Sequence, residues 1–122
     1  MSLKLLHKGT ESERRWKIIE VSKAQDSRYL PQLHARLESD ETYDNKRHII
    51  RALGSINTKE SGTVLMRLLG SSQGLILGDI CRALGRLGFI ESVPEIKKYA
   101  NHSEVWVKQE ANGAIKKLTK IV

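Results

Sequence analysis

The amino-acid sequence predicts an all-α fold in which antiparallel helix pairs stack into an α-solenoid. The tetrapeptide Arg-Ala-Leu-Gly at 51–54 occurs again at 82–85, 31 residues further on, and a degenerate copy stands at 113–116 after the same step. Apolar residues recur with helical spacing, and the alternation typical of strands is missing from the sequence. A fixed period of about 20–50 residues is typical of solenoids. The step of 31 residues therefore decides the predicted architecture.

The first helix of each pair carries an apolar stripe. Three mostly apolar columns recur at this step, at relative positions i, i+3 and i+4, which is the spacing of a helix face that packs on a core. The columns are Ile18, Ile49, Ile80 and Ala111; Val21, Ala52, Ala83 and Ala114; and Ser22, Leu53, Leu84 and Ile115. The small alanine column leaves room for a neighbouring helix. Gly54 and Gly85 are expected close to the helix ends, where glycine commonly terminates a helix.

A second apolar pattern lies between these stripes and predicts the other helix of each pair. Pro31 and Pro94 are expected in its first turn, where the missing N–H does no harm. The acidic connector at 38–41 is expected to be a solvated loop, and short connectors predict antiparallel neighbours. In order, the expected helices cover residues 11–24, 27–38, 43–55, 58–70, 73–87, 90–101 and 104–120.

These motifs resemble HEAT repeats of the phycobilisome-lyase-like type, in which a helix ending Ala-Leu-Gly-x-Ile/Leu precedes a helix with a Val-Pro-x-Leu-like start. The matching segments are 52–56, 83–87 and 93–96. The resemblance implies a right-handed superhelix of 31-residue repeats, about three and a half of them, in a single domain spanning 1–122. Leu77 stands where the family has an arginine, so an ion-pair ladder is expected to be interrupted there.

Apolar residues near both ends of the sequence differ from the polar caps that solenoids need. They include Leu3, Leu5 and Leu6 at one end and Ile121 and Val122 at the other. This pattern is expected of a domain excised from a longer protein.

Composition restricts the classes of function. The chain has 122 residues, a net charge of +7, 39% hydrophobic residues and no apolar run long enough to span a membrane. A basic chain favours an acidic partner or nucleic acid. The single cysteine, Cys81, excludes an internal disulfide and predicts a reducing compartment, the cytoplasm.

The sequence lacks the constellations that carry catalysis. The four histidines do not have the spacing of metal ligands, and Cys81 is expected in a small-residue packing role. Glycine-rich phosphate loops are also missing. We therefore expect no enzyme activity, no catalytic residue, no metal or other cofactor, and no small-molecule substrate.

The resemblance implies that the helices ending in Ala-Leu-Gly line a concave binding face. Its four rows are Trp16, Ile19, Glu20 and Ala24; Arg47, Ile50, Arg51 and Ser55; Gly78, Cys81, Arg82 and Arg86; and Gln109, Asn112, Gly113 and Lys117. Tyr43, Leu75 and Trp106 are expected at the helix entrances, and exposed Leu75 and Leu77 would form an apolar patch. The candidate partner-binding residues are Trp16, Tyr43, Arg47, Arg51, Arg82, Arg86, Trp106, Gln109 and Lys117.

Three functions are compatible with a basic face of this kind. The first is a non-enzymatic scaffold that binds an acidic segment of another protein. The second is a nucleic-acid-binding module, since HEAT-like stacks include alkylpurine DNA glycosylases that hold duplex on a basic face. The third is an accessory subunit of a bilin lyase-like enzyme complex, by resemblance to the proteins after which the repeat type is named.

Overall fold

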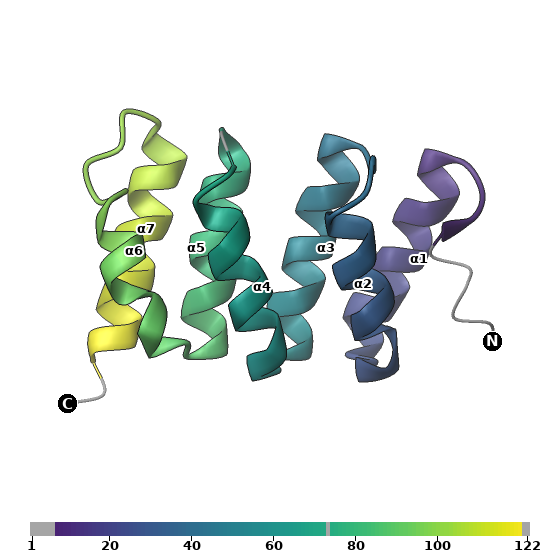
Figure 1. The fold of residues 1–122 in the computed structure, drawn as a ribbon, viewed down its shortest axis with the longest axis horizontal. Coiled ribbons are helices and arrows are strands. Elements are labelled where there is room, and N and C mark those ends of the chain that lie inside the picture. The colour runs from purple at the N-terminus through teal and green to yellow at the C-terminus, as the bar shows by residue number, and fades with distance from the viewer. Residues whose placement is uncertain (1–6, 73, 121–122) are drawn as a thin grey trace.

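The computed structural model describes residues 7–72 and 74–120, and these residues form α-helices, short 3₁₀ turns and connectors, with no strand among them (Figure 1). The predicted all-α class is confirmed. The apolar chain ends and the predicted helix start at Gln73 lie outside the described residues. The helices are α1 (Glu11–Ala24), α2 (Leu30–Leu37), α3 (Tyr43–Ile56), α4 (Lys59–Leu69), α5 (Leu75–Leu87), α6 (Val93–Lys97) and α7 (Val105–Thr119).

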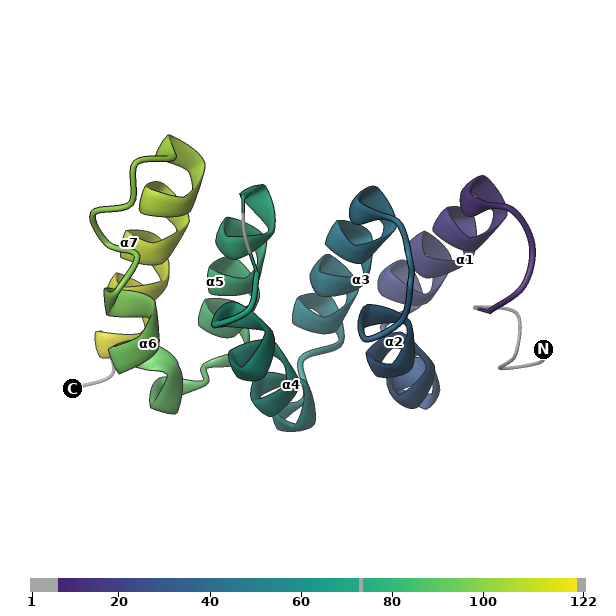
Figure 2. The same cartoon turned by 45° about the horizontal axis from the view of Figure 1, so that its top comes forward.

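The helices form two layers along the long axis of the molecule. Helices α1, α3, α5 and α7 lie side by side in chain order, and α2, α4 and α6 cover one side of that layer (Figures 1 and 2). Each helix of the first layer packs on the next, and α5 also packs on α4. The other side of the first layer is left uncovered, and it carries the groove described below.

The predicted helix boundaries agree closely with those of the structure, except at the beginnings and ends of α2 and α6. Short 3₁₀ turns at Ser27–Tyr29 and Ile90–Ser92 lead into α2 and α6. Pro31 and Pro94 stand in the first helical turn, as predicted. Helix α6 ends at Lys97, before the predicted limit at 101, because the next residues close tighter turns to the carbonyl three positions back.

The predicted apolar stripes form the core between the layers. Ile18, Ile49, Ile80, Leu53 and Leu84 are all fully buried. Leu77 is buried as well, so the apolar patch expected from exposed Leu75 and Leu77 is wrong: Leu77 belongs to the core, and Leu75 is half-buried.

Gly54 and Gly85 lie close to the ends of their helices, as predicted, but neither residue terminates its helix. Helices α3 and α5 end instead at Asn57 and Gly88, both in the left-handed conformation. The two glycines permit close helix approach. A Cβ on Gly54 would stand 3.3 Å from the backbone of Ala83, and one on Gly85 would stand 3.2 Å from that of Ala114.

The acidic connector is exposed at Glu38 and Asp40, as predicted, but it is not exposed at Glu41. The carboxylate of Glu41 is completely buried. It accepts hydrogen bonds from Arg14 on α1 (2.8 and 2.9 Å) and from Arg36 on α2 (2.9 Å). The side-chain amide of Asn45 on α3 also donates to this carboxylate, at 3.2 Å. The connector therefore joins three helices through one carboxylate.

None of the helices in the described residues is both long and apolar enough to cross a lipid bilayer.

Candidate partner-binding groove

Three adjoining hollows lie along the uncovered side of α3, α5 and α7, and we call them together the basic groove. Their volumes are about 310, 280 and 420 Å³. Arg86 lines all three, Arg82 lines the first two, and Lys117 lines the second and third. Arg51 lines the first, together with Ser55. The groove thus has four cations along its length.

The same local packing positions two of the groove cations, Arg86 and Lys117. The aliphatic stem of Arg86 on α5 lies over Gly54 of α3, at 3.8 Å from the position that a Cβ there would take. The stem of Lys117 on α7 lies over Gly85 of α5 in the same way, at 4.0 Å. Because glycine has no side chain, these stems can rest on the preceding helix while their charged ends remain exposed.

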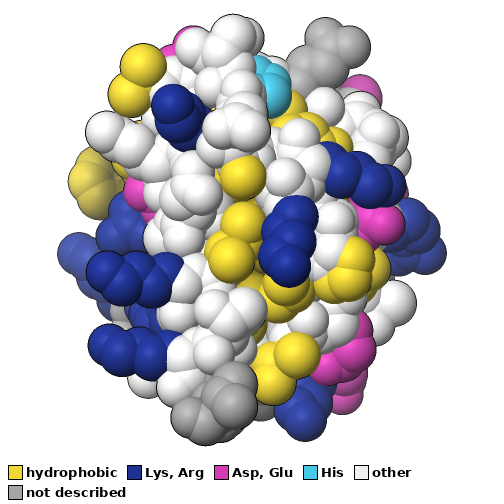
Figure 3. Space-filling model, turned by 90° about the vertical axis from the view of Figure 1, so that its left-hand side faces the viewer, with side chains coloured by type: hydrophobic (Ala, Val, Ile, Leu, Met, Phe, Trp, Pro, Cys, Tyr) yellow, Lys and Arg dark blue, Asp and Glu magenta, His cyan; other side chains and the backbone are white. Residues whose placement is uncertain are grey.

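Most of the positive charge in the groove is not neutralised by residues that the structure describes. Arg51, Arg86 and Lys117 are exposed and make no ion pair with any described residue. Arg82 stands 4.0 Å from Glu110, which is too long for a strong contact. Figure 3 looks onto the end of the molecule formed by α6 and α7, and lysine and arginine side chains gather along its left edge, on the side of α7.

Arg47 differs from the other predicted cations, and its assignment to an open ridge is corrected. Its guanidinium binds the buried carboxylate of Asp79 on α5, with Nε 2.5 Å from Oδ2. This pairing raises the pKa of Arg47 and leaves about a fifth of its side chain exposed. A buried carboxylate needs a paired cation, so Arg47 serves the contact between α3 and α5.

The predicted aromatic residues do not line the groove. Trp106, at the start of α7, covers Gly78 of α5, where any side chain would overlap the indole. Its Nε1 is buried and has no hydrogen-bond partner in the described structure. Tyr43, the first residue of α3, accepts a hydrogen bond from the backbone of Ile76 and lines a different cavity. Trp16 is 68% exposed on α1, outside the three hollows.

The four rows predicted for the concave face are also partly wrong. The errors fall two residues before Ala52 and Ala83. Ile50 and Cys81 are buried because the next helix in the layer covers them, whereas Asn112 on the last helix is exposed. Burial raises the pKa of Cys81 to about 12, so its thiol is not an activated nucleophile. Gln109 on α7 is exposed, as predicted, but does not line the groove.

Sequence reasoning missed two carboxylates in this region. Asp79 and Glu110 both line the groove, yet only Glu20 was expected among its rows. A signal for Asp79 was available, because a single acidic residue within the apolar segment 75–81 indicates a buried, paired charge. In residues 7–72 and 74–120, no group of three His, Cys, Asp or Glu side chains is arranged to hold a metal ion.

No model of a known protein family matches the chain, and no curated protein sequence shows significant similarity to it.

Proposed function

We propose that the chain is an α-solenoid of HEAT-like repeats and acts as a non-enzymatic scaffold, which binds an acidic segment of a partner protein in the basic groove. Two recurring contacts support the repeat. The pair Gly54 and Ala83 and the pair Gly85 and Ala114 approach each other in the same way, 31 residues apart. Repeats that contact only their neighbours build an extended binding surface of this kind.

The observation that carries the binding role is the charge of the groove. Arg51, Arg82, Arg86 and Lys117 lie along contiguous hollows, and among the described residues they make only one weak pairing, that of Arg82 with Glu110. Asp79 adds little opposing charge, because Arg47 neutralises it. A row of cations without internal partners attracts a ligand with several negative charges.

A protein partner is favoured over single-stranded nucleic acid. Proteins that bind single strands combine a basic channel with aromatic side chains on which bases stack. None of the described residues that line the basic groove is aromatic. Ser55 and Gln25 beside the cations supply neutral polar contacts of the kind that accompany charged residues at protein interfaces.

The free, buried thiol of Cys81 supports the proposal of a reducing, cytoplasmic setting.

The class of ligand can be tested by fluorescence anisotropy with three labelled probes: an oligo-glutamate peptide, a DNA duplex and a single-stranded RNA. We expect the peptide to bind at physiological salt. We expect nucleic acid to bind at low salt only, because release of counterions from phosphates makes that affinity fall steeply as salt rises. Nucleic acid that stays bound at physiological salt, with no peptide binding, would refute the protein-scaffold proposal.

A further inference from the structure

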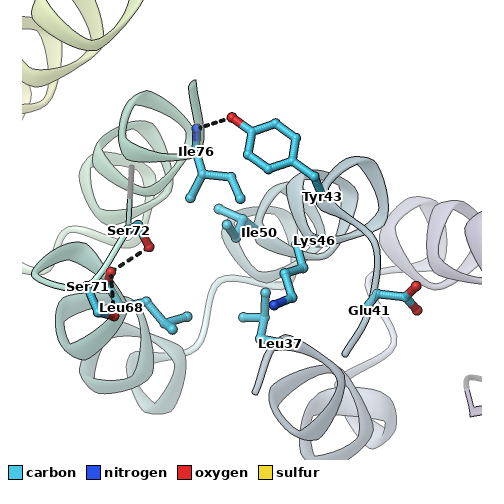
Figure 4. Close-up of a pocket in the computed structure, with 9 residues that line it drawn as sticks. All are labelled: Leu37, Glu41, Tyr43, Lys46, Ile50, Leu68, Ser71, Ser72 and Ile76. Atoms are coloured by element: carbon cyan, nitrogen blue, oxygen red, sulfur yellow. Dashed lines mark hydrogen bonds between the residues drawn. The ribbon is translucent and has the colours of Figure 1, made fainter. Parts of the chain in front are cut away.

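A second cavity lies between the helix pairs α2–α3 and α4–α5 and shares no lining residue with the basic groove. It has a volume of about 550 Å³, within the range of small-molecule sites. Leu37 of α2, Ile50 of α3, Leu68 of α4 and Ile76 of α5 form apolar walls. Figure 4 shows these side chains around a common space into which Lys46 of α3 extends.

Lys46 is the cation of this cavity and has no anionic partner among the described residues. Figure 4 shows its amine beside Leu37, whereas the Glu41 carboxylate points away from the cavity. The oxygens of Glu41 are already bound by Arg14 and Arg36. Lys46 is half-buried and pairs with no described carboxylate, so its ammonium group is available to the negative charge of a ligand.

Lys46 is the charged donor that the cavity offers to an anion, and the Tyr43 hydroxyl at the rim can donate as a neutral group. Ser71 and Ser72 donate their hydroxyl hydrogens to the carbonyl of Leu68, at 3.4 and 2.6 Å. Tyr43 accepts the N–H of Ile76 at the far rim of the cavity, at 3.3 Å. Neither serine can therefore donate to a ligand without giving up its present bond.

We propose that this cavity binds a small amphiphilic carboxylate with an alkyl body. The head group pairs with the Lys46 ammonium, and the alkyl chain lies against Leu37, Ile50, Leu68 and Ile76. Lys46 thereby gains an anion that the described residues do not provide, and the alkyl chain leaves water. The pairing of one cation with apolar walls selects against amines and neutral alcohols of the same length.

The probe is decanoate, with decylamine and decanol as analogues of equal chain length, and binding is measured by isothermal titration calorimetry. The test variant is Lys46→Met, which keeps most of the apolar stem and removes the charge. The matched control is Lys108→Met, because Lys108 occupies the corresponding position on α7, is exposed, and does not line the cavity.

We expect decanoate to bind saturably to the wild type and to Lys108→Met. Affinity should fall by about tenfold or more in Lys46→Met, the loss that corresponds to one charge-assisted hydrogen bond, and Lys46→Arg should retain binding. Lack of saturable decanoate binding would overturn the proposal. So would equal affinity for decanol, or unchanged affinity in Lys46→Met. Loss of decanoate binding in Arg51→Glu/Arg82→Glu would also overturn the proposal, because that result would show that decanoate binds in the basic groove.

Discussion

Buried carboxylates are each held by cations from other helices. Glu41 binds Arg14 and Arg36, and Asp79 binds Arg47. The sequence shows these residues as ordinary charges in a connector and a helix, and their partners lie up to 32 residues away. Pairing across that distance depends on the way the helices pack. Sequence reasoning therefore assigned Glu41 to solvent and Arg47 to the binding face.

Glu41 should make the stability of the fold sensitive to acid. Burial raises the pKa of this carboxyl group, but hydrogen bonds from Arg14, Arg36, Asn45 and the Thr42 N–H outweigh burial and hold the pKa at about 2, against an ordinary 4.5. The folded state thus binds the proton less tightly than the unfolded state. The stabilisation is complete above pH 4.5 and is lost as pH falls from 4.5 towards 2.

The substitution Glu41→Gln tests this directly. It should lower the free energy of unfolding at neutral pH by about 3 kcal/mol, the equivalent of the shift in pKa. It should also flatten the acid limb of a stability–pH curve measured by urea denaturation. Glu20→Gln is the control, because Glu20 is exposed on α1. A Glu41→Gln curve that kept the slope of the wild type between pH 4.5 and 2 would contradict this role for Glu41.

At the scale of elements, the period of 31 residues was sufficient to predict the helices, their order and the core columns. The function of the recurrent glycines was not predictable, because sequence position alone does not separate a helix end from a close helix contact. Gly54 and Gly85 proved to be contact residues, and Asn57 and Gly88 terminate the helices. The tight turns that shorten α6 also depend on local bonds that the periodicity does not encode.

Gly54→Ala should destabilise the protein. The added methyl group would stand 3.3 Å from Ala83 on α5, so α5 would have to move by a few tenths of an ångström against its packing on α4 and α7. Overpacking costs about 1–3 kcal/mol, which exceeds the gain of about 1 kcal/mol from replacing glycine in a helix.

The control is Gly113→Ala, where the new methyl group meets no atom within 4 Å. It should stabilise the protein by about 0.5–1 kcal/mol. Thermal denaturation of both variants measures the two effects. Stabilisation by both substitutions would show that α3 and α5 are not packed as closely as described.

At the scale of the whole molecule, the two layers separate two kinds of surface. The uncovered side carries cations along contiguous hollows, and an open cavity between α2, α3, α4 and α5 has Lys46 as the one lysine among its described lining residues. The sequence predicted four of the groove cations, Arg51, Arg82, Arg86 and Lys117, because the step of 31 residues aligns them. The cavity was not predicted, since its walls come from four helices and two connectors.

The most direct test of the groove is the affinity of the labelled oligo-glutamate peptide for Arg51→Glu/Arg82→Glu, measured by anisotropy at physiological salt. The matched control, Lys59→Glu/Lys97→Glu, makes the same change in charge at exposed positions on α4 and α6. We predict that the groove variant binds the peptide about tenfold more weakly or worse, with unchanged helix content by circular dichroism, while the control stays near the wild type. An equal loss of affinity in both variants would show that peptide binding depends on the net charge of the protein alone. That result would contradict a binding site in the basic groove.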